Sequence, residues 1–137
     1  MRLDGLTEFQ QDLLNTSKKA HKEIPKVMRK VGSKARTVVA KKARAKVKKK
    51  TGNYHKKWKR GKVFKSNDEF VVRVYNNSSH AHLIEDGHVQ KTANGRTVGF
   101  TRGKHVLKDG MREFEASGVI DEMIGDWLDD LLTRNRL

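Results

Sequence analysis

The stretch HAHLIEDGH, residues 80–88, contains four side chains that could bind a metal ion or transfer protons. They are His80, His82, Glu85 and His88. A zinc or other transition-metal site needs three or four ligands that converge from fixed elements. On a helix, His82, Glu85 and His88 at spacings of three would lie along one face, so the spacing allows a metal-binding interpretation.

The element that must position these residues argues against that interpretation. We predict a short helix over residues 81–86, and Gly87 ends it before His88 is reached. His80 and His82 fall on different faces, and the sequence has no His-Glu-x-x-His pair. We therefore expect no metal and no other cofactor, and we expect the histidines and Glu85 to cap and hydrogen-bond local backbone.

Covalent catalysis and metal-dependent nuclease chemistry find equally little support. Ser78 and Ser79 lie close to His80, but they lack an orienting acid and the glycine pattern of a nucleophile elbow. A metal-dependent nuclease needs carboxylates beside its histidines, and only Glu85 and Asp86 are available. We expect the protein not to be an enzyme.

The composition predicts a single domain, residues 1–137, with a modest core. Of its 137 residues, 35% are hydrophobic, and the mean hydropathy is -0.82, so part of the stability is expected to come from partners. The chain has no cysteine, which excludes disulfides and thiolate metal sites. The N-terminus lacks a signal-peptide pattern and no run approaches ~18 apolar residues, so we expect a protein made in the cytoplasm without a membrane span.

The net charge of +15 is unevenly distributed. Residues 1–65 hold 22 Lys and Arg against 4 acidic residues, a balance of +18, whereas residues 66–137 hold 9 against 12, a balance of -3. A basic half suits a polyanion such as nucleic acid, an acidic half suits the basic half of a second copy, and Lys-rich helices can also present merely solvated faces. The lysines that could line a DNA channel or dock on an acidic protein are Lys41, Lys42, Lys46, Lys48, Lys49 and Lys50.

The hydrophobic pattern predicts an α+β fold that begins with a long basic helix. Thr7 and Gln10 have the spacing of a capping box, so we expect the helix to start at Thr7 and to continue to about residue 48. Pro25 lies inside this stretch and predicts a kink. Residues 1–50 would form a helical arm that packs along one side only.

A small β unit is predicted to follow, within residues 51–104. Strands near 61–65 and 69–76, joined by the turn-forming Ser66-Asn67-Asp68, make an antiparallel hairpin. The short central helix comes next, and residues 89–104 form a glycine-rich loop with room for a small strand.

Residues 105–137 are predicted to form an acidic C-terminal helix, weakened in its first half by Gly110 and Gly118. Its apolar side is expected to anchor the helix to the domain or to a neighbouring subunit. The residues expected in that packing are Trp127, Leu128, Leu131 and Leu132.

Several segments resemble a family of phage head-to-tail joining proteins named after the tenth gene product of phage HK-ninety-seven. HAHLIEDGH, NGRTVG and KHVLKDG are similar to the family's His-Leu-Leu-Glu-x-Gly-His element, Asn-Gly-Gly-Arg-like loop and helix-opening His-Ile. KKTGNYHKKW is similar to its Pro-x-x-Thr-Gly-x-Tyr-x-x-x-Trp segment, and VYNNS to its Val-Tyr-Asn strand end. The sequence departs from the pattern in Lys48 for the usual proline, in Asp86, and in a longer loop over residues 97–102.

The resemblance covers residues 48–111 and carries over to individual positions, which we call the signature residues. They are Thr51, Gly52, Tyr54, Trp58, His82, Leu83, Glu85, Gly87, His88, Gly95, Arg96, Gly99 and His105. What the resemblance implies for them is a structural role in turns, in the first strand, in the central helix and at the start of the last helix.

The resemblance implies a structural virion protein of a long-tailed double-stranded DNA phage. Such a protein forms a homo-oligomeric ring, here expected to be a hexamer, at the neck or tail end, where it completes the tail or joins it to the head. Its partners would be other neck and tail proteins, with non-specific contact to the genome DNA. The alternative is a free-standing, non-specific nucleic-acid-binding protein, although residues 15–53 contain no aromatic residue for base stacking.

Overall fold

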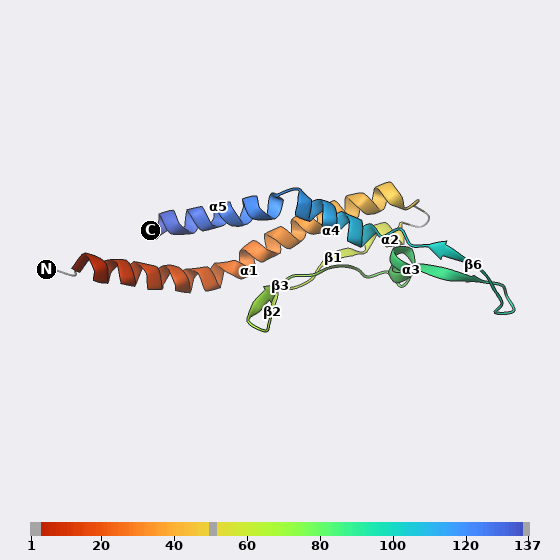
Figure 1. Ribbon diagram of the computed structural model, residues 1–137, viewed down its shortest axis with the longest axis horizontal. Helices are drawn as coiled ribbons and strands as arrows, with labels where there is room; N and C mark the ends of the chain where they lie inside the picture. Colours follow the sequence, from red (N-terminus) through yellow and green to blue (C-terminus); the bar gives the residue numbers. More distant parts are fainter. Residues whose placement is uncertain (1–3, 50–51, 136–137) are drawn as a thin grey trace.

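A long helix, α1 (Asp4–Lys46), forms the spine of an elongated α+β molecule (Figure 1). The fold is seen in a computed structural model that describes residues 4–49 and 52–135. The 43 residues of α1 correspond to about 64 Å of helix. The predicted start at Thr7 is wrong, because helical backbone continues to Asp4. Pro25 lies inside the helix, which changes direction along its length (Figure 1), as expected where a proline removes a backbone hydrogen bond.

The core lies along one stripe of α1. The buried residues of this stripe recur every four positions: Val27, Val31, Ala35, Val39 and Ala43. Helix α4 (Val106–Ala116) packs against it through Val106 and Phe114, which are 0% and 2% exposed. The spacing places one apolar face of α1 against its neighbours and leaves the other faces to Lys and Arg.

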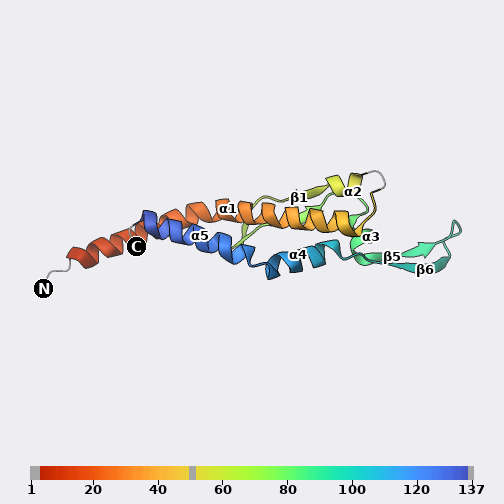
Figure 2. The same ribbon diagram turned by 90° about the horizontal axis from the view of Figure 1, so that it is seen from above.

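The predicted single C-terminal helix is in fact two helices. Helix α4 ends at Ala116, and α5 (Val119–Arg134) begins after Gly118, whose φ of 77° is left-handed. Glycine adopts this conformation without the steric cost of a Cβ, so the chain turns here. Beyond the break, α5 follows the N-terminal half of α1, and the two chain ends lie at the same end of the molecule (Figures 1 and 2).

The predicted hairpin is confirmed, with an interruption in its middle. Strand β1 (Trp58–Arg60) pairs with β4 (Val74–Asn76), and β2 (Phe64–Ser66) pairs with β3 (Glu69–Val71), all antiparallel. Three residues, 61–63, face two, 72–73, so the pairing register shifts by one residue as it does at a β-bulge.

The tip of this hairpin has the predicted turn chemistry. Asn67 and Asp68 both have positive φ, 49° and 65°. This is the backbone that a two-residue hairpin turn with native twist requires, and Asn and Asp tolerate it better than other side chains.

The glycine-rich segment after the central helix was predicted as a loop with room for a small strand, and the structure corrects this to a pair of strands. Helix α3 (Ala81–Asp86) forms as expected after the short α2 (Asn53–Lys56), but β5 (Gly87–Lys91) and β6 (Thr97–Arg102) then form a second antiparallel hairpin. This hairpin projects from the end of the molecule opposite the termini (Figures 1 and 2). Its apolar residues are exposed, so no buried face marked it in the sequence.

Candidate functional site

The histidines of the central element do not converge. His80, His82 and His88 are all exposed, and His80 lies at the position that precedes α3. Within residues 4–49 and 52–135, no three His, Asp or Glu side chains are grouped so as to hold a metal ion.

Glu85 links α3 to the start of α4. Its two carboxylate oxygens accept hydrogen bonds from the backbone N–H groups of Leu107 at 2.9 Å and Lys108 at 3.0 Å. These N–H groups belong to the first turn of α4, where no intrahelical acceptor is available. The negative charge also lies at the positive end of the helix dipole. The carboxylate is therefore a helix cap supplied from a distant part of the chain.

The backbone joins the same two elements. Lys104 donates its N–H to the carbonyl of Ile84 at 2.7 Å, and His105 donates to that of Glu85 at 3.2 Å. His105 has a φ of 49° and precedes α4 directly. Glu85 and His105, predicted as structural signature residues, thus lie together at one helix start.

Two glycines let the base of the β5–β6 hairpin close against α3. A Cβ on Gly87, whose φ is 85°, would overlap the carbonyl oxygen of Thr101. A Cβ on Gly103 would overlap the carbonyl oxygen of Glu85. Gly103 was not among the signature residues, and its only sequence signal is that it is a glycine just before His105.

The remaining hairpin signature residues shape its tip and its pairing. Gly95 has a φ of 79°, and Thr92 and Arg96 bracket the turn through a backbone N–H to carbonyl hydrogen bond of 2.9 Å. A Cβ on Gly99 would lie 2.9 Å from the side-chain oxygen of Gln90. These residues serve the turn and the strand pairing.

Tyr54 and Trp58 belong to the core beneath α1. Trp58 is 3% exposed and packs with Val39, Ala43 and Val106. The Tyr54 ring lies edge-on to it, with centroids 5.7 Å apart. Burial, and then the nearby charge of Glu85, raise the pKa of Tyr54 to about 12. Gly52 takes up a left-handed φ of 81° before α2, and Thr51 lies outside the described residues.

A cleft of about 680 Å³ opens beside this cluster, between the end of α1, α2, α3 and the base of the second hairpin. Its apolar lining includes Val47, Tyr54 and Leu83. His55 Nδ1 and Ser78 Oγ also belong to lining residues, and both atoms are buried without a hydrogen-bond partner among residues 4–49 and 52–135. Among the described residues, no carboxylate belongs to the lining of this cleft.

The six lysines singled out in the sequence have different environments. Lys42 pairs with Glu113 at 2.6 Å, and Lys46 pairs with Asp109. Hydrogen bonds from these lysines hold the pKa values of both carboxyl groups below their usual range. Lys41, Lys48 and Lys49 are exposed, and Lys50 lies outside the described residues.

The four apolar residues predicted to anchor the C-terminal helix also differ. Leu131 is 1% exposed, whereas Leu128 is 43% exposed and Trp127 and Leu132 are half-buried. Leu131 is thus the residue of the four that is fully buried against the rest of the chain.

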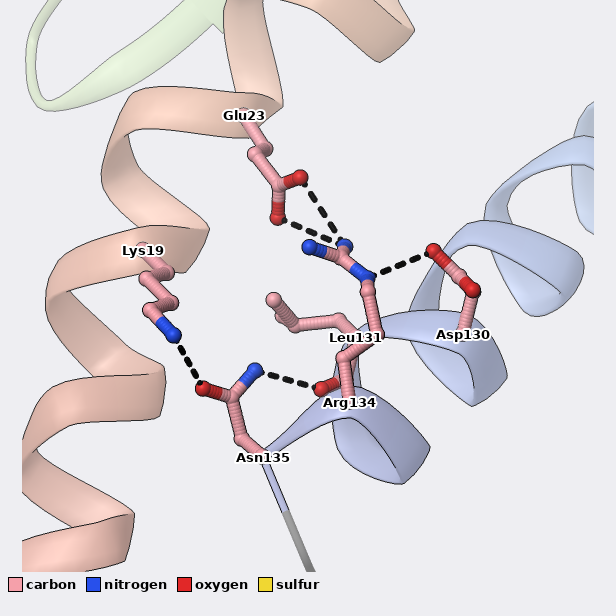
Figure 3. Close-up of polar contacts among 6 residues, drawn as sticks. All are labelled: Lys19, Glu23, Asp130, Leu131, Arg134 and Asn135. Atoms are coloured by element: carbon pink, nitrogen blue, oxygen red, sulfur yellow. Dashed lines mark hydrogen bonds and ion pairs between the residues drawn. The ribbon is translucent and has the colours of Figure 1, made fainter.

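Polar contacts surround Leu131 where α5 meets α1 (Figure 3). Arg134 pairs with Glu23 at 2.9 Å and with Asp130 at 2.8 Å. Lys19 donates to the side-chain oxygen of Asn135 at 2.8 Å, and the Asn135 amide donates to the Leu131 carbonyl at 2.7 Å. Asn135 therefore both ends α5 and fastens it to α1.

Apolar side chains are exposed at both ends of the long axis. On the β5–β6 hairpin, Val98 and Phe100 are each 61% exposed and Val89 is 47% exposed. In the N-terminal part of α1, Leu13 and Leu14 are 51% and 50% exposed. These surfaces are among those that the single chain leaves uncovered.

Several of the described signature residues have structural roles: Glu85 caps a helix, Trp58 lies in the core and Gly95 shapes a turn. A comparison with protein-family profiles matches residues 7–87 to the family described as "Bacteriophage HK97-gp10, putative tail-component". The chain belongs to this family and is a phage tail structural protein, which places it in the virion. No curated protein and no solved structure matches the chain. The match ends at Gly87, so five signature residues lie beyond it: His88, Gly95, Arg96, Gly99 and His105.

Within residues 4–49 and 52–135, no helix is long and apolar enough to cross a lipid bilayer.

Proposed function

We propose that this chain forms a homo-oligomeric ring, a hexamer, at the head-proximal end of a phage tail, where it completes the tail and joins it to the head. The role is architectural and requires no catalysis. Family membership supports the tail location. The observation that carries the ring is the projecting β5–β6 hairpin, whose Val98 and Phe100 are exposed.

The exposure of these side chains favours contact with a neighbour. Soluble chains seldom keep adjacent large apolar side chains in water unless a partner covers them. A hairpin that leaves the body of one subunit can reach the next, and a heterologous contact of this kind closes into a ring when the rotation between subunits is right.

Mass measurement of the purified protein, alone and with tail extracts, tests the proposal. We expect assemblies at multiples of the 15.7 kDa chain mass, and tails that become able to join filled heads when the protein is added. A V98S/F100S variant should stay monomeric and fail in joining, while K91A, an exposed change on the same hairpin, should behave as wild type.

Two results would contradict the proposal. If the wild-type chain stays monomeric with tail extracts present and does not restore joining, the ring proposal is wrong and the nucleic-acid-binding alternative takes its place. If V98S/F100S assembles and joins normally, the hairpin is not the ring contact.

A further inference from the structure

A second groove, distinct from the cleft at α2 and α3, is lined mainly by positive charge. It has a volume of about 680 Å³ and lies along the exposed face of α1, bordered by β1 and α5. Its cations are Lys26, Arg29, Lys30, Lys34 and Arg60, and no carboxylate is among its lining residues. We call this surface the α1 groove.

The charge of the α1 groove is available to a ligand. Lys26, Arg29, Lys30 and Lys34 are exposed, and none of them has an ion pair with a described carboxylate. Two of the lysines near the end of α1 differ, because Lys42 and Lys46 are already paired with Glu113 and Asp109, whereas Lys41, Lys48 and Lys49 are exposed. That end of the helix also carries the negative pole of the helix dipole, which offsets part of their charge.

We propose that the α1 groove binds the phosphate backbone of double-stranded DNA without reading its sequence. Residues 26–37 of α1 span about 17 Å, which is the rise of roughly five phosphates along one DNA strand. Four of the five groove cations lie on this segment of α1, and the fifth, Arg60, comes from β1. Its remaining lining residues are Ser33, Thr37 and Met123, and the two hydroxyls are of a kind that donates to phosphate oxygens.

The lining favours a duplex backbone over other occupants. It contains no aromatic side chain, so it offers no stacking platform for unpaired bases. An acidic protein partner would need apolar contact area, because the centre of a protein interface is depleted in charge. Met123 is the one apolar residue of the lining. Arg60 is also suited to contact with the DNA phosphate backbone, because two contacts hold its side chain at the groove. Its Nη1 donates to the Gly61 carbonyl at 3.1 Å, and its aliphatic carbons pack close to Gly32.

The inference rests on the proposed function only for the source of the DNA, which would be the phage genome passing the tail end. A contact made of four or five phosphates is suited to that setting. It is weak enough at physiological salt for a genome to slide past, because each phosphate contact steepens the loss of affinity with salt.

The test compares two full-length variants with equal charge loss in binding a short fluorescent DNA duplex. The groove variant is K26Q/R29Q/K30Q/K34Q, and the matched variant is K41Q/K48Q/K49Q/K56Q, all at exposed positions. Because wild type makes these four phosphate contacts, we expect its affinity for the duplex to fall about a hundredfold when the salt concentration rises from about 50 to 200 mM. The groove variant should lose that dependence, lowering the log-log salt slope by about 3 to 4. The matched variant should stay within about threefold of wild type.

Two further measurements complete the test. A K26R/K30R/K34R variant with Arg29 unchanged keeps the four charges and should bind the duplex as wild type does. Two duplexes of unrelated sequence should bind alike. Equal binding by wild type and the groove variant overturns the proposal, as does a larger loss in the matched variant. Normal DNA binding with lost self-association in the groove variant would assign the groove to an acidic surface of another copy. Because the isolated chain is used, head-to-tail joining can fail or succeed independently.

Discussion

At the scale of single residues, Glu85 is the side chain whose function the structure defines most sharply. Its carboxylate is positioned by α3 and used by α4, so it couples two elements that are 22 residues apart in the chain. The residue type was recognisable as part of a pattern with histidines. The hydrogen-bond partners of Glu85 could not be predicted, because the backbone N–H groups of Leu107 and Lys108 carry no sequence signal of their own.

Removing this cap should weaken the fold. We expect E85A to lower the free energy of unfolding by about 1–2 kcal/mol, the usual cost of losing a helix cap. E85Q keeps an acceptor oxygen but loses the charge at the helix terminus, and should cost less. Urea unfolding measures both, with D86A as an exposed control expected to change stability by less than about 0.5 kcal/mol. An E85A variant as stable as wild type would show that water replaces the cap.

Tyr54 should make the protein sensitive to alkaline pH. Its pKa is about 12 in the folded chain against 10.0 for a free phenol. Folding therefore favours the neutral form, so the contribution of Tyr54 to stability is intact below about pH 10 and is lost as the pH rises toward about 12. Thermal melting across this range should show a smaller decline for Y54F than for wild type, with Y75F as the control. Identical declines in all three proteins would contradict the role of Tyr54.

At the scale of elements, the glycines of the last two helices have opposite surroundings. A Cβ on Gly110 would lie 3.0 Å from Val39 Cγ2 and 3.1 Å from Val39 Cα, whereas a Cβ on Gly125 would meet nothing within 4 Å. Gly110 is thus needed where α4 crosses α1. Gly125 is a helix-interior glycine without such a contact.

The two glycines therefore predict opposite responses to the same substitution. G110A should destabilise the protein by about 1–3 kcal/mol through overpacking against backbone. G125A should stabilise it by about 0.5–1 kcal/mol, since Ala is the better helix former. Unfolding curves of both variants measure this difference, and a change of the same sign in the two would refute the assigned packing.

The elements that sequence predicted well are those with a local physical cause. The stripe of α1, the Asn67-Asp68 turn and the stop of α3 at Gly87 each depend on residues close in the chain. The β5–β6 hairpin was missed because its strands bury neither face, so Val98 and Phe100 gave no sign of a core. The division of α4 from α5 was missed because Gly118 could equally weaken a continuous helix.

At the scale of the whole molecule, the surroundings of the predicted site residues depend on how distant elements of the chain pack together. Glu85, Gly87 and His105 lie together because α3 meets the start of α4, a contact that the resemblance anticipated only as a pattern. Of the six lysines, Lys42 and Lys46 are paired with acidic residues that α4 brings to them. Charge counted along the chain cannot reveal this neutralisation. It depends on which helix packs against which.

The junction of α5 with the N-terminal half of α1 determines how firmly the elongated molecule holds its shape. Leu131 is buried there and is surrounded by the contacts of Arg134 and Asn135 (Figure 3). We expect L131A to lower the free energy of unfolding by about 2–5 kcal/mol, the usual range when a buried leucine is replaced by alanine and a cavity remains. L128A, at a position that is 43% exposed, should cost less than about 1 kcal/mol in the isolated chain.

The same pair of variants also reports on assembly. If α5 faces a neighbour in the ring, L128A should leave the melting temperature of the monomer unchanged while weakening assembly in sedimentation measurements. L131A should lower the melting temperature whether or not the protein is assembled, because its contacts lie within one chain. A large loss of monomer stability in L128A with none in L131A would show that α5 packs on α1 through Leu128 and not through Leu131.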